Sequence, residues 1–111
     1  MAAVEVKQVG RLGVDPEMRM VGKSNAAKKA RTTLFVLSNE RWIDDATKQT
    51  AERTTAIRWV LWGARAESTA RLLKKGAKVA IGGRLENIKY VDREGRRVQS
   101  FQFVASTVQT I

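Results

Sequence analysis

The sequence predicts a mainly β protein: a small barrel of five strands, with one short α-helix between the third and fourth strands. Two observations lead to this prediction. Five segments have the apolar or alternating composition of strands, and glycines interrupt the first and fourth of them, as where strands of small closed barrels bend. One further segment has apolar residues at helical spacing. The length of 111 residues suits one domain, residues 1–111.

The first strand is expected over residues 3–14, where Gly10 and Gly13 mark a bend or a bulge. Pro16 ends this strand, because proline lacks the N–H group that a ladder needs. Residues 19–31 are basic and polar without any acid, and they predict a loop. The loop is either a phosphate-attracting arm or a solvated connection, and for any single lysine in it we prefer the second interpretation.

The second and third strands form a hairpin. The second strand begins near Thr32, a polar turn region opens at residues 39–42, and the turn itself lies at 44–49. The third strand, residues 55–62, alternates, so that its two faces differ. One face is wholly apolar and is expected in the core: Ile57, Trp59 and Leu61. The other face is partly exposed: Ala56, Arg58, Val60 and Trp62.

A short amphipathic helix is expected over Ala64–Lys75, with Gly76 as its C-cap and Lys74 and Lys75 in its last turn. The fourth strand covers residues 77–89 and bends at Gly82 and Gly83. A hairpin at residues 90–95 leads to the fifth strand, residues 98–106, which carries Phe101 and Phe103 on one face. This order of elements is that of the oligonucleotide-binding (OB) barrel.

The composition favours a polyanionic partner. Lys and Arg number 21 against 11 Asp and Glu, a formal charge of +10, which favours nucleic acid over an anionic membrane. Cysteine and histidine are absent, and adjacent Asp44 and Asp45 lack a third ligand at suitable spacing, so neither a metal site nor another cofactor is expected. No phosphate-binding loop or nucleophile motif occurs, which argues against an enzyme. No apolar run is long enough for a membrane span and no secretory signal is present, so a cytoplasmic, nucleoid-associated location is expected.

Several fragments, in the right order over nearly the whole chain, resemble the bacterial-type single-stranded DNA-binding proteins. They are residues 10–19, 38–42, 52–54, 58–63, 74–79 and 83–85. The resemblance implies sequence-independent binding of single-stranded DNA, which protects the strand during replication, recombination or repair. Aromatic side chains would stack on bases, and basic side chains would follow the phosphates.

Carried over to this sequence, the resemblance implies stacking at Trp42, Trp62 and Tyr90. Phe35 is a further stacking candidate, with an ordinary barrel side chain as an equal alternative. Phosphate contacts are expected from Arg11, Arg41, Arg58, Arg84 and Lys89.

The chain also departs from the family pattern. Ala56 stands where relatives often carry a tryptophan, so one stacking position is lost, and Glu86 and Ile88 replace expected basic residues. Ala80 replaces a tyrosine of the usual subunit contact, which leaves a homotetramer favoured only slightly over a dimer. The chain stops at Ile111 without an acidic tail, so tail-mediated recruitment of partners is not expected, and a plasmid or phage origin is suspected.

Two alternatives stay open. One is an OB-fold protein-interaction module of the replication-restart (primosomal) type, with weak nucleic-acid binding. The other is a preference for single-stranded RNA, because stacking does not distinguish the sugars.

Overall fold

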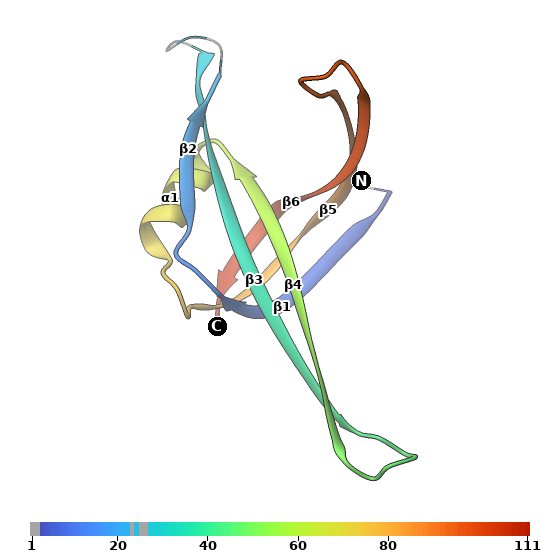
Figure 1. Ribbon diagram of the computed structural model, residues 1–111. Helices are drawn as coiled ribbons and strands as arrows, with labels where there is room; N and C mark the ends of the chain where they lie inside the picture. Colours follow the sequence, from blue (N-terminus) through green and yellow to red (C-terminus); the bar gives the residue numbers. More distant parts are fainter. Residues whose placement is uncertain (1–2, 23, 25–26) are drawn as a thin grey trace.

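The computed structural model describes residues 3–22, 24 and 27–111, and its main feature is one highly twisted, mainly antiparallel sheet of long strands (Figure 1). In the described part of the chain, one α-helix packs beside the sheet near the start of β3. The elements in chain order are β1 Glu5–Leu12, β2 Glu17–Val21, β3 Lys29–Ile43, β4 Thr50–Trp62, α1 Ala64–Leu72, β5 Lys78–Val91 and β6 Arg97–Thr110.

The sheet closes on itself. Its strand order is β1-β5-β6-β4-β3-β2, and β1 also pairs with β3, so that five of these strands form a barrel and β2 is an added edge strand. The pairing of β4 with β6 is parallel and short, joining Trp59 to Phe103 and Val60 to Val104. The helix lies between the barrel strands β4 and β5 in the chain. The predicted OB barrel with its helix is therefore confirmed.

Trp59 lies at the centre of the core. It is fully buried, and its ring contacts that of Phe103 at a centroid distance of 5.6 Å. Its indole Nε1–H donates a hydrogen bond of 2.8 Å to Oε1 of buried Gln8, whose amide nitrogen in turn donates to the carbonyl oxygen of Val36. Gln8 therefore satisfies polar groups on two other strands, which fixes β1 against β3 and β4. The prediction that Ile57, Trp59 and Leu61 face inward is confirmed. Val60, expected on the partly exposed face, is instead buried, where β4 meets buried Val104 of β6.

The strands differ from the sequence prediction in number and length. Six strands occur among the described residues, because residues 17–21 of the expected turn and basic loop pair with residues 29–33 of β3. All five residues of β2 are exposed, and its short alternation of Met18 and Met20 with Glu17 and Arg19 stands between Pro16 and the basic residues, where a turn and a loop were expected. Residues 39–42, expected to begin a turn, continue β3 with regular pairing to β4. Lys23 and Asn25 of the expected basic arm lie outside the described residues.

The helix is shorter than predicted. It ends at Leu72, and Leu73 caps it in an extended conformation, which lets the Leu73 side chain enter the core. Lys74 and Lys75 therefore lie beyond the helix, where they cannot complement its last turn. Gly76 is not the cap, and its backbone N–H instead donates to the carbonyl oxygen of Leu12, at a φ of +89° that favours glycine.

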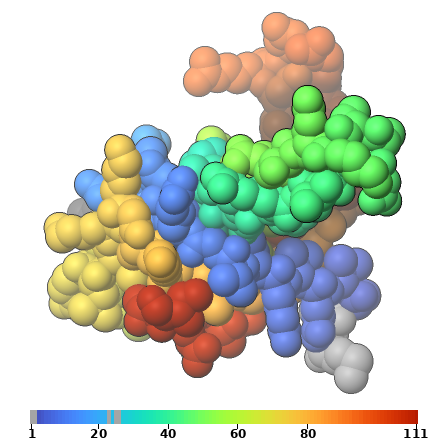
Figure 2. Space-filling view, turned by 90° about the horizontal axis from the view of Figure 1, so that it is seen from below, coloured from blue at the N-terminus to red at the C-terminus, as the bar shows by residue number. Residues whose placement is uncertain are grey.

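Two hairpins extend well beyond the barrel, because β3, β4, β5 and β6 are each 13 to 15 residues long (Figures 1 and 2). We call residues 39–54 the β3–β4 arm and residues 86–102 the β5–β6 arm. At the tip of the first arm, backbone N–H groups of Thr47 and Ala46 bond the carboxylate of Asp44 and hold its pKa below the ordinary value. The residues at 44–49 form the turn that the sequence predicted.

Candidate nucleic-acid interface

Strand register divides the predicted site residues between two surfaces. Neighbouring residues of a strand point to opposite sides, and directly paired residues share a side. The pairing of β3 with β4 runs from Arg31–Trp62 to Ile43–Thr50 without a shift, so the alternation persists along the whole arm. We call the side opposite to the core residues the outer side. Seven predicted residues lie on it: Phe35, Trp62, Tyr90, Arg11, Arg41, Arg58 and Arg84.

Trp42 and Lys89 fall on the other side, in the rows that continue the core-facing residues out along the arms. We call these the inner rows. Trp42 follows Val36 in its row, and Lys89 follows Leu85. The structure therefore does not bring Trp42 together with Trp62, because the two rings lie at opposite ends and on opposite sides of one hairpin.

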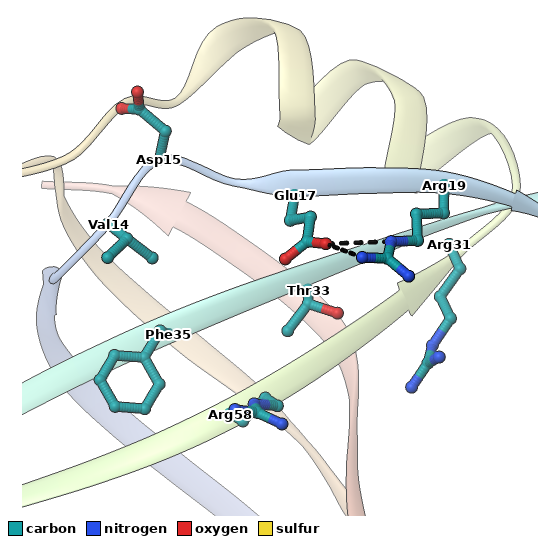
Figure 3. Close-up of a pocket in the computed structure, with 8 residues that line it drawn as sticks. All are labelled: Val14, Asp15, Glu17, Arg19, Arg31, Thr33, Phe35 and Arg58. Atoms are coloured by element: carbon teal, nitrogen blue, oxygen red, sulfur yellow. Dashed lines mark hydrogen bonds and ion pairs between the residues drawn. The ribbon is translucent and has the colours of Figure 1, made fainter.

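An open groove of about 480 Å³ crosses the outer side of β2, β3 and β4 (Figure 3). Phe35 and Arg58 are directly paired in its floor, and Arg31, Thr33 and Phe35 project from the same side of β3. Arg19 lies across from Arg31 on β2. The groove thus combines one aromatic ring with three guanidinium groups.

Both acids that line the groove are already engaged within the chain. Glu17 forms an ion pair of 2.7 Å with Arg19, drawn in Figure 3, and Asp15 accepts a 2.7 Å hydrogen bond from the backbone N–H of Lys75. Within the described residues, no carboxylate lies within ion-pairing distance of Arg31 or Arg58. These two cations therefore remain available to an anion that enters the groove.

Trp62 extends the groove along β4. The guanidinium of Arg31 lies over its ring at 5.8 Å from the centroid, within the range of a cation–π contact, and the ring is 41% exposed. The Nε atom of Arg31 is buried and, among the described residues, has no hydrogen-bond partner. Arg19 and Arg31 were not among the predicted contacts, since both were assigned to a loop. Once residues 29–33 are known to be strand, alternation with Phe35 places Arg31 on the outer side.

Two of the other predicted phosphate contacts are paired with acids. Arg41 lies 2.7 Å from Glu52 and Arg84 lies 2.7 Å from Glu86. Such exposed pairs contribute at most about 1 kcal/mol, so a phosphate can replace the carboxylate. Each exchange nevertheless reduces the net gain from that arginine.

The arms carry the remaining aromatic candidates. Trp42 is partly exposed, and the guanidinium of Arg53 lies over its ring at 5.3 Å. Tyr90 lies on the outer side of the β5–β6 arm, paired with Val98. Ala56, where relatives often have tryptophan, is exposed on the outer side of β4, two residues from Arg58. At this position, the outer side of β4 beyond the groove therefore lacks the ring on which relatives could stack a base.

The described residues contain no cluster of three or more acids, histidines or cysteines that could hold a metal ion. No helix in the described part of the chain is long and apolar enough to cross a membrane.

The chain matches one family model and resembles many solved structures, two of which serve as examples. Residues 4–111 match the model of the single-strand binding protein family. The Plasmodium falciparum SSB, in complex with ssDNA, superposes with a TM-score of 0.80 at 19% identity, covering 100% of this chain and 97% of that one. A deletion mutant of the Thermus aquaticus single-stranded DNA binding protein gives 0.79 at 24% identity, covering 97% of this chain and 50% of that one. At these identities, the structural likeness concerns the fold.

Proposed function

The chain belongs to the single-strand binding protein family, and from this premise we propose that it binds single-stranded DNA over the outer groove without sequence preference. The observation that carries the proposal is a groove that holds Phe35 beside Arg31 and Arg58, two cations that no carboxylate of the described residues pairs, with the ring of Trp62 next to Arg31. Binding there would protect the strand in replication, recombination or repair.

Bases stack on Trp62 and Phe35, and phosphates lie against Arg58 and Arg31. Trp62 is directly paired with Arg31, and Arg31 lies four residues from Phe35 on β3. The rings of Trp62 and Phe35 are therefore about 13 Å apart along the strand. That spacing leaves room for intervening nucleotides over Thr33, which lines the groove between them. Stacking tolerates any base, because every base has a π-face, and contributes about 1–3 kcal/mol per base.

The other predicted contacts extend the path from the groove. Arg11 lies beside Leu37 on the outer side, while Arg41 and Arg84 exchange their carboxylate partners for phosphates. Along the arms, Tyr90 and Trp42 stack on bases, and Lys89 contacts a phosphate.

Tryptophan fluorescence tests this function. Titration with oligo-dT should quench the emission of wild-type protein, and Trp62→Ala should weaken binding by about 5- to 150-fold, the equivalent of one stack. Trp59 is fully buried, so its emission should persist at saturation. Binding that is independent of salt, or that is unchanged in Trp62→Ala, would refute the groove as the site. Tighter binding of an oligo-U of the same length would instead assign the groove to RNA.

We also propose that the chain acts in the cytoplasm as a homo-oligomer, with a tetramer favoured over a dimer. Val9 is well exposed on the outer side of β1, directly opposite the small side chain of Ala80, and a second copy could approach closely there. Native mass spectrometry, with and without a long oligonucleotide, should report four subunits. A monomer at micromolar concentration would contradict the proposal.

A further inference from the structure

The β5–β6 arm presents an aromatic ring that no part of the proposed path uses. Phe101 is 66% exposed, a larger fraction than that of Trp42, Trp62 or Tyr90. It lies in the inner row of the arm, in the same row as core residue Phe103, whereas Tyr90 lies on the outer side. A single exposed apolar side chain needs no explanation by itself, so the residues that surround Phe101 decide how its exposure is interpreted.

The inner row around Phe101 has a distinctive composition. Asn87 is directly opposite Phe101, Lys89 is diagonal to it, and Gln99 and Arg97 follow toward the tip. No acid belongs to this row. Glu86 lies on the outer side with its partner Arg84, and the two acids of the turn, Asp92 and Glu94, are both paired with Arg96. The row therefore offers one ring, the exposed side chain of Val91, two amides and two cations that no carboxylate of the described residues pairs.

We propose that this inner row is a second contact for the same single-stranded DNA, in which a base stacks on Phe101 while Lys89 and Arg97 neutralise the flanking phosphates. The inference rests on the proposed function, because it concerns a further segment of the strand held in the groove. Aromatic rings beside cations are the composition of single-strand sites. The centre of an interface between two protein chains contains few charged residues. Phe101 instead has the charged side chains of Lys89 and Arg97 in its row.

The two contacts lie on different sides of the sheet. The groove occupies the outer side of β2, β3 and β4, and the Phe101 row faces the inner side of β5 and β6. A strand must pass an edge of the sheet to reach both. The second contact is therefore expected only for oligonucleotides longer than the groove itself holds.

The test compares Phe101→Ala with wild type on dT oligomers of about 4 and about 16 nucleotides, the range of site sizes of single OB folds. The variant should bind the long oligomer about 5- to 150-fold more weakly and the short one equally well. Phe101→Trp should restore the affinity for the long oligomer, and Phe101→Leu should not, because leucine keeps apolar surface but has no π-face. Leu72→Ala, which removes another strongly exposed apolar side chain on α1, is the matched control and should change neither affinity.

Each outcome is decisive. Equal affinity of Phe101→Ala and wild type for the long oligomer, or full rescue by Phe101→Leu, would overturn the inference. Native mass spectrometry of the same samples should show the same subunit number in all variants, and a loss of subunits in Phe101→Ala would make the ring a contact between copies. If wild type binds neither oligomer, the proposed function itself fails. If Trp62→Ala weakens both oligomers while Phe101→Ala weakens neither, only the second contact fails.

Discussion

Replacing Arg58 tests the electrostatic part of the proposed interface most directly. Arg58 lies in the groove floor beside Phe35, and no carboxylate of the described residues lies within ion-pairing distance of it. Its charge can therefore be used entirely for a phosphate. Arg58→Ala should remove one neutralised phosphate and leave the stacking rings in place.

The expected effect is a change of salt slope rather than a fixed loss of affinity. Each neutralised phosphate of a single strand contributes about −0.7 to the slope of log affinity against log salt. Between about 50 and 200 mM salt, one contact accounts for a factor of about 2.6 in affinity, because the fourfold increase in salt concentration is raised to the power 0.7. Wild type should thus lose about 2.6-fold more affinity over this range than Arg58→Ala.

The assay is fluorescence anisotropy of a labelled dT oligomer at four or more salt concentrations. Arg65→Ala on α1 is the matched control, because it removes the same charge from a surface outside the groove. Its slope should equal that of wild type. If Arg65→Ala flattens the slope as much as Arg58→Ala does, the net charge of the protein governs binding, and the assignment of Arg58 to a phosphate is refuted.

Two further predictions concern an ion pair and a close backbone approach. Glu52→Gln should free Arg41 from its 2.7 Å ion pair. Binding of dT oligomers at low salt should then become up to about fivefold tighter, the equivalent of one exposed ion pair. Weaker binding would mean that the ion pair orients Arg41 for its phosphate. Gly83→Ala should lower the unfolding free energy in urea by about 2–3 kcal/mol, because an added Cβ would lie 1.9 Å from the carbonyl oxygen of Val104. Gly82→Ala is the neighbouring control, with a nearest approach of 3.2 Å to a side chain, and an equal loss in the two variants would contradict this explanation.

The sequence predicted best where burial imposes a period on a strand. Trp59 and Leu61 are fully buried and Ile57 packs partly buried against the core, as the alternation indicated, although Val60 between them is buried as well. The same reasoning failed for β2, because its alternating Met18 and Met20 span only five residues beside Pro16 and a basic run, which favoured a turn and a loop. The strands expected from the sequence were also too short in the β3–β4 arm. Residues 39–42 keep their backbone pairing in the arm, but they lack the apolar alternation by which a buried strand is recognised.

The candidate site was predictable one residue at a time but not as an arrangement. Strand parity within β4 placed Arg58 and Trp62 on one side from the sequence alone. The position of Trp42 relative to Trp62 depends instead on the register of 13 consecutive pairs, which alternation within either strand does not reveal. Arg31 was missed because the sequence did not show that β3 begins at Lys29. Only the pairing of Arg31 with Trp62 in the two strands brings the guanidinium over the ring.

The placement of Trp42 and Trp62 on opposite sides of one hairpin has a mechanical consequence. A strand that engages both rings must turn around the hairpin, so tension applied to its ends does not load the two stacks equally. The contact nearer the pulled end carries the force first, and the turn shields the other until the first has opened. Stretching a single coated strand should therefore release length in discrete steps per subunit, and the force of the later step should fall in Trp62→Ala when the pull begins from the Trp42 side.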